Sequence, residues 1–166
     1  MRIRSLLIIL LVSSNIYSQL SHTQTADSIL YNTVNYVQAA TQQQATNGVH
    51  TVVYNNILNP AYQMKKMYLD SAGTKQLSKT FYFNGALHGP YESYQMDKLL
   101  AKGRYKEGKL DGERVTYWGN GTTIMEKGNF TEGKRFGVWE YYKVDGTLRR
   151  RVTYNTSGAI SQDQQF

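Results

Sequence analysis

The feature that most constrains the fold of this chain is a set of glycines that recurs at a fixed interval. Four glycines in the stretch GRYKEGKLDGERVTYWGNG reappear 25 positions later in GNFTEGKRFGVWEYYKVDG. The first set is Gly103, Gly108, Gly112 and Gly121, and the second is Gly128, Gly133, Gly137 and Gly146. A fixed period in this range is typical of an array of stacked supersecondary units.

Three copies of one unit can be aligned on an aromatic residue, two residues, Gly, three residues, Gly, four residues and Tyr. The copies lie near residues 80–102, 103–127 and 128–152, at intervals of 23 and then 25 residues. Their anchors are Tyr82, Gly85, Gly89 and Tyr94, then Tyr105, Gly108, Gly112 and Tyr117, then Phe130, Gly133, Gly137 and Tyr142. Looser copies precede them, so the repeat region is placed at residues 48–158.

Turn chemistry predicts that each unit is a β-hairpin. Glycine permits tight reversals that other residues resist, and Asn-Gly and Asp-Gly are strong hairpin signals. The stretches between them, such as ERVTYW and VWEYYK, are rich in strand-forming residues. A single hairpin is marginal in water, so the units are expected to share one antiparallel sheet. The expected turn glycines are Gly85, Gly89, Gly108, Gly112, Gly121, Gly133, Gly137 and Gly146.

The two ends of the chain differ from the repeats. Residues 1–18 combine Arg2 and Arg4 with an apolar run, Leu6–Val12, and are interpreted as a secretory signal peptide, with a buried N-terminal strand or helix as the alternative. Residues 19–47 are polar and amide-rich and predict a short helix or a disordered linker. Residues 159–166 are expected to form a C-terminal tail. The mature chain is predicted to be exported: periplasmic, associated with the outer membrane, or secreted.

Composition limits how the chain is held together and what it binds. Cysteine is absent, which excludes disulfides and thiolate chemistry, whereas 14 Tyr, 5 Phe and 2 Trp supply side chains for a sheet with one packed face. The formal net charge of +7 favours anionic partners, or it keeps a solvated surface soluble. Nucleic acid is not expected as a partner of an exported protein.

The repeated units resemble MORN repeats, in particular a bacterial variant with a G-x-x-x-G core. The matching segments are YKEGKLDGERVTYWGNG and FTEGKRFGVWEYYKVDG, with YFNGALHGPYESY as a looser copy. The resemblance covers roughly residues 68–154 and does not reach residues 19–47. It implies one elongated, curved antiparallel sheet and a role as a scaffold or docking surface. Bacterial variants of the repeat are sometimes labelled antitoxin-like, and some MORN arrays are associated with membranes.

No arrangement of residues in the sequence predicts catalysis. The three histidines, His22, His50 and His88, are not at metal-ligand spacing, and the position of His88 is taken by Asp111 and Phe136 in the other units. No helix follows the paired glycines, so they are interpreted as structural rather than as a phosphate-binding loop. We therefore expect a protein that is not an enzyme and has no catalytic residue, metal or cofactor.

The expected function is that of a non-catalytic protein that docks another macromolecule, most often a protein, or organises the cell envelope. Two alternatives remain: a peripheral binder of anionic lipid or glycan, and an antitoxin-like or immunity-like inhibitor. Open sheet edges also allow a homodimer. The candidate binding face is Tyr91, Tyr94, Tyr117, Trp139, Tyr141 and Tyr142, although packing of these rings into a core is the alternative. The candidate contacts to an anionic ligand are Lys106, Lys109, Lys134 and Arg135.

Overall fold

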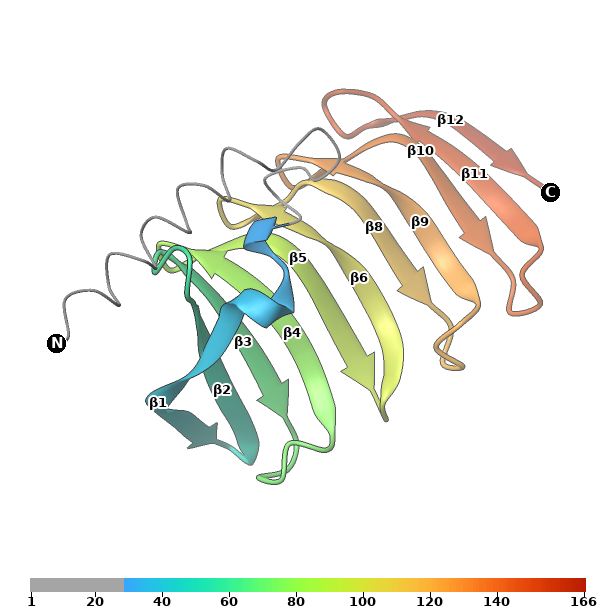
Figure 1. Ribbon diagram of the computed structural model, residues 1–166. Helices are drawn as coiled ribbons and strands as arrows, with labels where there is room; N and C mark the ends of the chain where they lie inside the picture. Colours follow the sequence, from blue (N-terminus) through green and yellow to red (C-terminus); the bar gives the residue numbers. More distant parts are fainter. Residues whose placement is uncertain (1–28) are drawn as a thin grey trace, which may run out of the picture.

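The computed structural model describes residues 29–166 of the chain. The expected signal peptide and the first part of the amide-rich segment lie outside the described residues. The described chain forms a single 12-stranded sheet in which strands that are neighbours in sequence are also neighbours in space (Figure 1). All pairs are antiparallel, and the sheet twists and curves along its length. The predicted fold class, tandem hairpins in one antiparallel sheet, is confirmed.

The strands follow chain order across the sheet, except that the short β7 pairs only with β6. Their bounds are β1 (Tyr36–Thr46), β2 (Val49–Asn56), β3 (Tyr62–Tyr68), β4 (Gln76–Phe83), β5 (Ala86–Gln95), β6 (Lys98–Lys106), β7 (Lys109–Leu110), β8 (Gly112–Tyr117), β9 (Ile124–Thr131), β10 (Lys134–Tyr142), β11 (Leu148–Tyr154) and β12 (Ile160–Gln165).

The prediction of a helix or linker up to residue 47 was wrong for most of its described part. Ile29 and Leu30 are helical, and the 3-10 turn Thr33–Asn35 then leads into β1, with the Asn32 side chain accepting a hydrogen bond from the Val34 amide at 3.2 Å. Residues 36–46 instead pair with the valine-rich β2, whose backbone groups need a partner. At the other end the expected tail forms β12, which pairs with β11.

The first glycine of each G-x-x-x-G motif makes the tight turn that the sequence predicts. In each hairpin this glycine and the residue before it both have positive φ, as a two-residue type I′ turn requires. The pairs are Asn84 (49°) with Gly85 (81°), Glu107 (50°) with Gly108 (82°), and Glu132 (49°) with Gly133 (82°). Gly121 and Gly146 lie in the turns at the opposite ends of the strands, where their amides bond to Trp118 and Lys143.

The second glycine of each motif is not in a turn, which corrects the prediction for Gly89, Gly112 and Gly137. These glycines lie within or at the start of β5, β8 and β10, with φ of 94°, 94° and 67°. The strand registers shift close to them, between Thr80 and Tyr82 in β4–β5 and between Phe136 and Glu140 in β9–β10. The motif therefore encodes a turn followed by a bulge, which bends the strand.

Neighbouring units are joined by a repeated contact at the hairpin tips. The Gly108 amide donates to the Leu87 carbonyl oxygen, and the Gly133 amide donates to that of Leu110, both at 2.8 Å. One residue further along, the side chains of His88 and Asp111 accept hydrogen bonds from turn amides of the next unit, at 3.4 and 3.2 Å. These two side chains therefore serve the same structural purpose.

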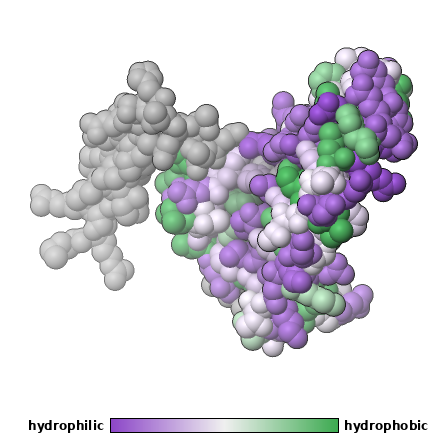
Figure 2. Space-filling view, turned by 90° about the vertical axis from the view of Figure 1, so that its right-hand side faces the viewer, coloured by the Kyte–Doolittle hydropathy of each residue, from purple (hydrophilic) through white to green (hydrophobic). Residues whose placement is uncertain are grey.

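The sheet buries little of its surface in the described part of the chain. Nine hydrophobic side chains are buried there: Tyr36, Val53, Met64, Tyr68, Phe81, Ala101, Val115, Trp139 and Val152. In the view of Figure 2, hydrophobic residues form separate small patches among hydrophilic ones. A single sheet with so few buried side chains leaves both of its faces largely available to solvent and partners.

Candidate interaction faces

The cross-strand registers divide the predicted binding residues between the two faces of the sheet. Tyr91, Arg114 and Trp139 occupy equivalent positions, two residues after the second glycine of each unit, and we call their side of the sheet the Trp139 face. The opposite side carries Lys102 and the residues in register with it, and we call it the Lys102 face. The six candidate aromatic residues therefore do not form one surface.

Trp139 is fully buried, with 0% of its surface exposed. An added Cβ on Gly128 would lie only 2.3 Å from the indole ring, so this glycine leaves the space that the ring fills. Phe130 meets the ring edge-on at 5.1 Å, and the indole Nε1 donates to the Asn129 carbonyl oxygen at 3.1 Å. Trp139 belongs to the core, so the expectation that it lies on a docking surface was wrong.

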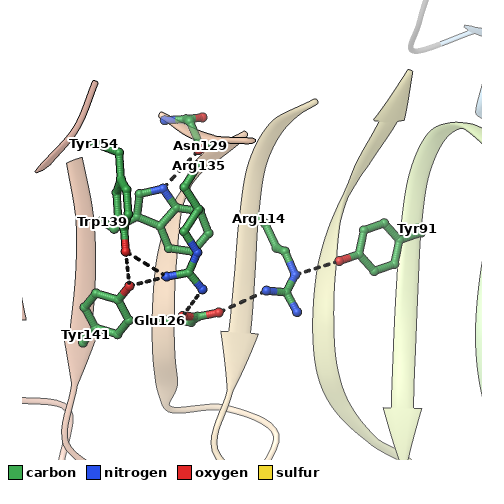
Figure 3. A network of polar contacts seen from close by, with 8 residues as sticks. All are labelled: Tyr91, Arg114, Glu126, Asn129, Arg135, Trp139, Tyr141 and Tyr154. Atoms are coloured by element: carbon green, nitrogen blue, oxygen red, sulfur yellow. Dashed lines mark hydrogen bonds and ion pairs between the residues drawn. The ribbon is translucent and has the colours of Figure 1, made fainter. Parts of the chain in front are cut away.

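Arg135 covers the outer side of Trp139, with its guanidinium carbon 4.0 Å from the ring centre. The same guanidinium donates to Glu126 Oε2 at 3.1 Å and to the hydroxyl oxygens of Tyr141 and Tyr154 (Figure 3). All of these polar groups are hydrogen-bonded within this cluster. Arg135 is thus a structural cation, and its expected role as a free contact for an anionic ligand is not supported by this geometry.

The polar chain continues from Glu126 toward the middle of the sheet (Figure 3). Glu126 Oε1 accepts from Arg114 at 3.0 Å, and Arg114 Nε donates to the Tyr91 hydroxyl oxygen at 3.1 Å. Only 12% of the Glu126 side chain is exposed, so this carboxylate holds two arginines within a partly desolvated layer. Tyr91 and Tyr141 therefore mark the two ends of a rigid polar chain on the Trp139 face.

Burial and the neighbouring Tyr154 hydroxyl raise the pKa of Tyr141 to about 12, so this phenol stays protonated at neutral pH. The Tyr141 and Tyr154 oxygens are 3.4 Å apart, and either hydroxyl can donate to the other. The pair therefore retains a proton that can be directed outward to a bound group.

Tyr94 and Tyr142 lie on the Lys102 face, where each binds the carboxylate two residues before it. The hydroxyl of Tyr94 donates to Glu92 at 2.6 Å, and that of Tyr142 donates to Glu140 at 2.7 Å. Tyr117 has the equivalent position in its unit, but Val115 replaces the carboxylate there. Equivalent strands are two spacings apart, about 9.6 Å. That separation is too wide for the three rings to stack on one another, so Tyr94 and Tyr142 form separate tyrosine–carboxylate pairs.

The remaining predicted contacts to an anionic ligand lie at the hairpin tips. Lys106 and Lys109 line a groove of about 470 Å³ together with Glu107, Asp111 and Glu132. Lys134 lies at the start of β10, where its Cβ is 3.4 Å from the position of an added Cβ on Gly158. With three carboxylates beside two lysines, the groove has no excess of positive charge and is a poor site for an anion.

The described residues contain no group of three or more histidine and acidic side chains that could hold a metal ion. Within the same part of the chain, the structure has no helix whose length and apolar character would allow it to cross a bilayer. His88 accepts a hydrogen bond from a turn amide and packs 5.7 Å from Phe83, so its position is explained by packing.

Comparison with known proteins adds little. No family model and no curated protein sequence matches this chain. Two solved structures of TarM are similar over 77% of the chain: an S. aureus TarM variant in complex with fondaparinux, alpha-GlcNAc-glycerol and UDP (TM-score 0.34, 12% identity), and TarM in a second crystal structure (TM-score 0.30, 13% identity). The matched region spans 27% and 26% of those chains. Similarity at this level carries no argument about fold or function.

Proposed function

We propose that this chain is an exported, non-catalytic binding protein whose open sheet docks another macromolecule. The observation that carries the proposal is the single-layer sheet itself. Residues 36–165 form the twelve strands of the sheet and the turns that connect them. In the described part of the chain, only residues 29–35 precede the first strand. Among the residues that the structure describes, only the short segment before β1 covers part of this long two-sided surface, and such a surface is suited to binding rather than to enclosing a substrate.

The resemblance of the repeated units to MORN repeats supports the same proposal, because such arrays are expected to act as scaffolds. The Trp139 face offers ordered hydroxyls at Tyr91 and Tyr141, and the Lys102 face offers alternating charges. Both surfaces are held by hydrogen bonds within the sheet, so little side-chain entropy is lost when a partner binds.

A capture experiment tests the proposal and assigns the face. The chain without residues 1–18 is immobilised and exposed to an extract of its own cell envelope at moderate ionic strength. Two variants are compared with it: Tyr141→Phe on the Trp139 face and Tyr142→Phe on the Lys102 face, each of which removes one hydroxyl and keeps the ring. Retention of a defined macromolecule that one variant weakens, with unchanged melting curves, supports the proposal.

Two results would overturn it. One is the absence of any retained macromolecule with the unmodified chain. The other is turnover of an added substrate that depends on residues of either face. Capture of one effector protein whose toxicity the chain relieves would instead identify the antitoxin-like alternative.

A further inference from the structure

The Lys102 face contains one straight row of residues that runs across ten strands. Each member lies directly opposite the next in the printed registers, so the row crosses the strands at right angles and extends for about 43 Å at ~4.8 Å per strand. We call it the Lys102 row. In sheet order its members are Val52, Lys66, Lys79, Glu92, Lys102, Val115, Lys127, Glu140, Arg151 and Gln164.

Opposite charges alternate through part of this row and form ion pairs. Lys79 Nζ lies 2.7 Å from Glu92 Oε2. Glu140 pairs on both sides, with its Oε2 3.2 Å from Lys127 Nζ and its Oε1 2.9 Å from Arg151 Nη2. These contacts explain why a row of charged side chains is tolerated within a sheet. They use both carboxylates of the row, whereas the row has five cations.

Two places in the row break the alternation. Lys66 lies directly opposite Lys79, an arrangement of like charges that destabilises a sheet. Further along, Val115 separates Lys102 from Lys127 at the position that carries glutamate in the units before and after it. Local conflicts of this kind are expected where a surface is kept for binding rather than for stability. The row therefore has an excess of three positive charges, and Lys102 is solvent-exposed.

The density of this charge indicates the class of polymer that would fit. Three net charges over ~43 Å correspond to one charge per ~14 Å, whereas a nucleic acid strand has one phosphate per ~3.4 Å. The interspersed carboxylates Glu92 and Glu140 would repel such a dense polyanion. A sugar polymer with widely spaced acidic groups avoids this conflict, because its hydroxyls can donate to carboxylates while its acidic groups meet lysines.

The curvature of the sheet decides between a polymer and a lipid surface. The row runs along the direction in which the sheet twists and curves (Figure 1). A flat lipid surface would contact only part of the row, whereas a flexible chain can follow all of it. We propose that the Lys102 row binds a linear acidic polysaccharide that carries a carboxylate on spaced sugars. This inference rests on the proposed function and names the partner that the sheet would dock.

The test measures binding of the chain without residues 1–18 to hyaluronate, whose carboxylates lie on every second sugar, by isothermal titration calorimetry at low salt. The variant Lys66→Gln/Lys102→Gln removes the two cations that stand outside the ion pairs of the row. The matched control, Lys109→Gln/Lys134→Gln, changes the net charge equally at the hairpin tips. We expect the row variant to weaken binding at least about tenfold, and the control to change it less than about twofold.

A second variant, Val115→Glu, places a carboxylate at the position of the row where the units before and after carry Glu92 and Glu140. We expect it to weaken binding as well, because it lowers the excess charge of the row without removing any lysine. Circular dichroism melting curves of all variants show whether the sheet is intact. If Val115→Glu does not fold, the lysine pair and its control still decide the outcome.

Four results would overturn the inference: no binding of the unmodified chain to hyaluronate at low salt, equal weakening by the row variant and its control, tighter binding to anionic vesicles, or tighter binding to single-stranded DNA. If hyaluronate does not bind while the chain still retains another macromolecule from the envelope extract, the row has been misassigned and the docking function stands. If neither is retained, the proposed function fails as well.

Discussion

The largest buried side chains at the two ends of the sheet lie on opposite faces. At the early end, β1–β4, the core of Tyr36, Met64 and Phe81 lies on the Lys102 face, in register with residues of that side. At the late end, β9–β11, the core of Trp139 and Val152 lies on the Trp139 face. One continuous sheet with a repeating strand pattern therefore changes the side on which it packs.

The two cores are covered in different ways. At the early end the segment before β1 folds over the sheet, and the Tyr31 ring meets Phe81 edge-on at 5.3 Å. Both the Tyr36 hydroxyl and the Asn56 amide donate to the Leu30 carbonyl oxygen, at 2.8 and 3.1 Å, and so fix this segment. At the late end, a side chain of the sheet itself, Arg135, covers the tryptophan. The comparison shows that the strand pattern permits a core on either face of the sheet. Individual large side chains determine which face is buried.

The largest expected effects come from removing the central ring of each core. Trp139→Ala and Phe81→Ala are each expected to lower the free energy of unfolding by about 3–5 kcal/mol. Because repeat arrays are held by contacts between neighbours, hydrogen exchange should show loss of protection mainly at the mutated end. Val138→Ala, with 48% of the native side chain exposed, is the control and should be nearly neutral in urea unfolding. Equal loss at both ends would mean that the sheet unfolds as one unit.

The next effect tests the late core alone. Gly128→Ala places a methyl group 2.3 Å from the Trp139 ring and is expected to destabilise the protein by about 1–3 kcal/mol through overpacking. The matched control is Gly119→Ala, where an added Cβ meets nothing within 4 Å and the change should stay within about 0.5 kcal/mol. Thermal or urea unfolding measures both. Similar stability of the two variants would contradict the packing of Trp139 against Gly128.

A smaller effect is expected from the polar chain above the late core. Glu126→Gln removes the charge that holds Arg114 and Arg135, and should cost about 1–2 kcal/mol because the native contacts are partly desolvated. The control, Glu113→Gln, changes an exposed carboxylate of the adjacent β8. Urea unfolding of both variants measures the two losses in stability. A loss at Glu113 as large as that at Glu126 would show that net charge, rather than the polar chain, sets the difference.

The smallest expected effect depends on pH and concerns the Lys102 face. Hydrogen bonds from Tyr142 and Arg151, with further help from Lys127, lower the pKa of Glu140 to about 2. A carboxylate with a lowered pKa contributes stability that is present above its ordinary value, near 4.5, and is lost as the pH falls toward 2. The effect should stay below about 1 kcal/mol because the partners are partly exposed.

Melting temperatures of the native chain and of Glu140→Gln provide the measurement. The advantage of the native chain should be constant above pH 5 and should shrink between pH 4.5 and 2. An advantage that does not change over this range would show that Glu140 contributes through packing rather than through its charge.

Much of the architecture could be predicted from the glycine spacing. The period, the hairpins and the turns at Gly85, Gly108 and Gly133 follow from the positive φ that these positions require. β1 was missed because its amide-rich sequence has low strand propensity, and pairing with β2 overrides that tendency. The bulge glycines were mistaken for turn residues, since both conformations need glycine.

The candidate site was harder to predict because strand alternation shows which residues share a face but not which face is buried. Trp139 was offered as a docking residue for that reason. One signal was available: Gly103 and Gly128 lie inside strands, where glycine often marks a close approach by a large neighbour. Arg135 was taken for a free cation because its acidic partner, Glu126, lies in a different strand, in the last residues of the preceding unit.

The type I′ turns and bulges give the array a property that concerns its growth over evolutionary time. Each unit adds one up-and-down excursion and leaves the next strand with the same orientation as before. Duplication of a whole unit would therefore lengthen the protein by about 9.6 Å without exchanging its two sides. An insertion equivalent to a single strand would reverse the direction of everything after it. The length of the sheet across its strands can thus change only in steps of two strands.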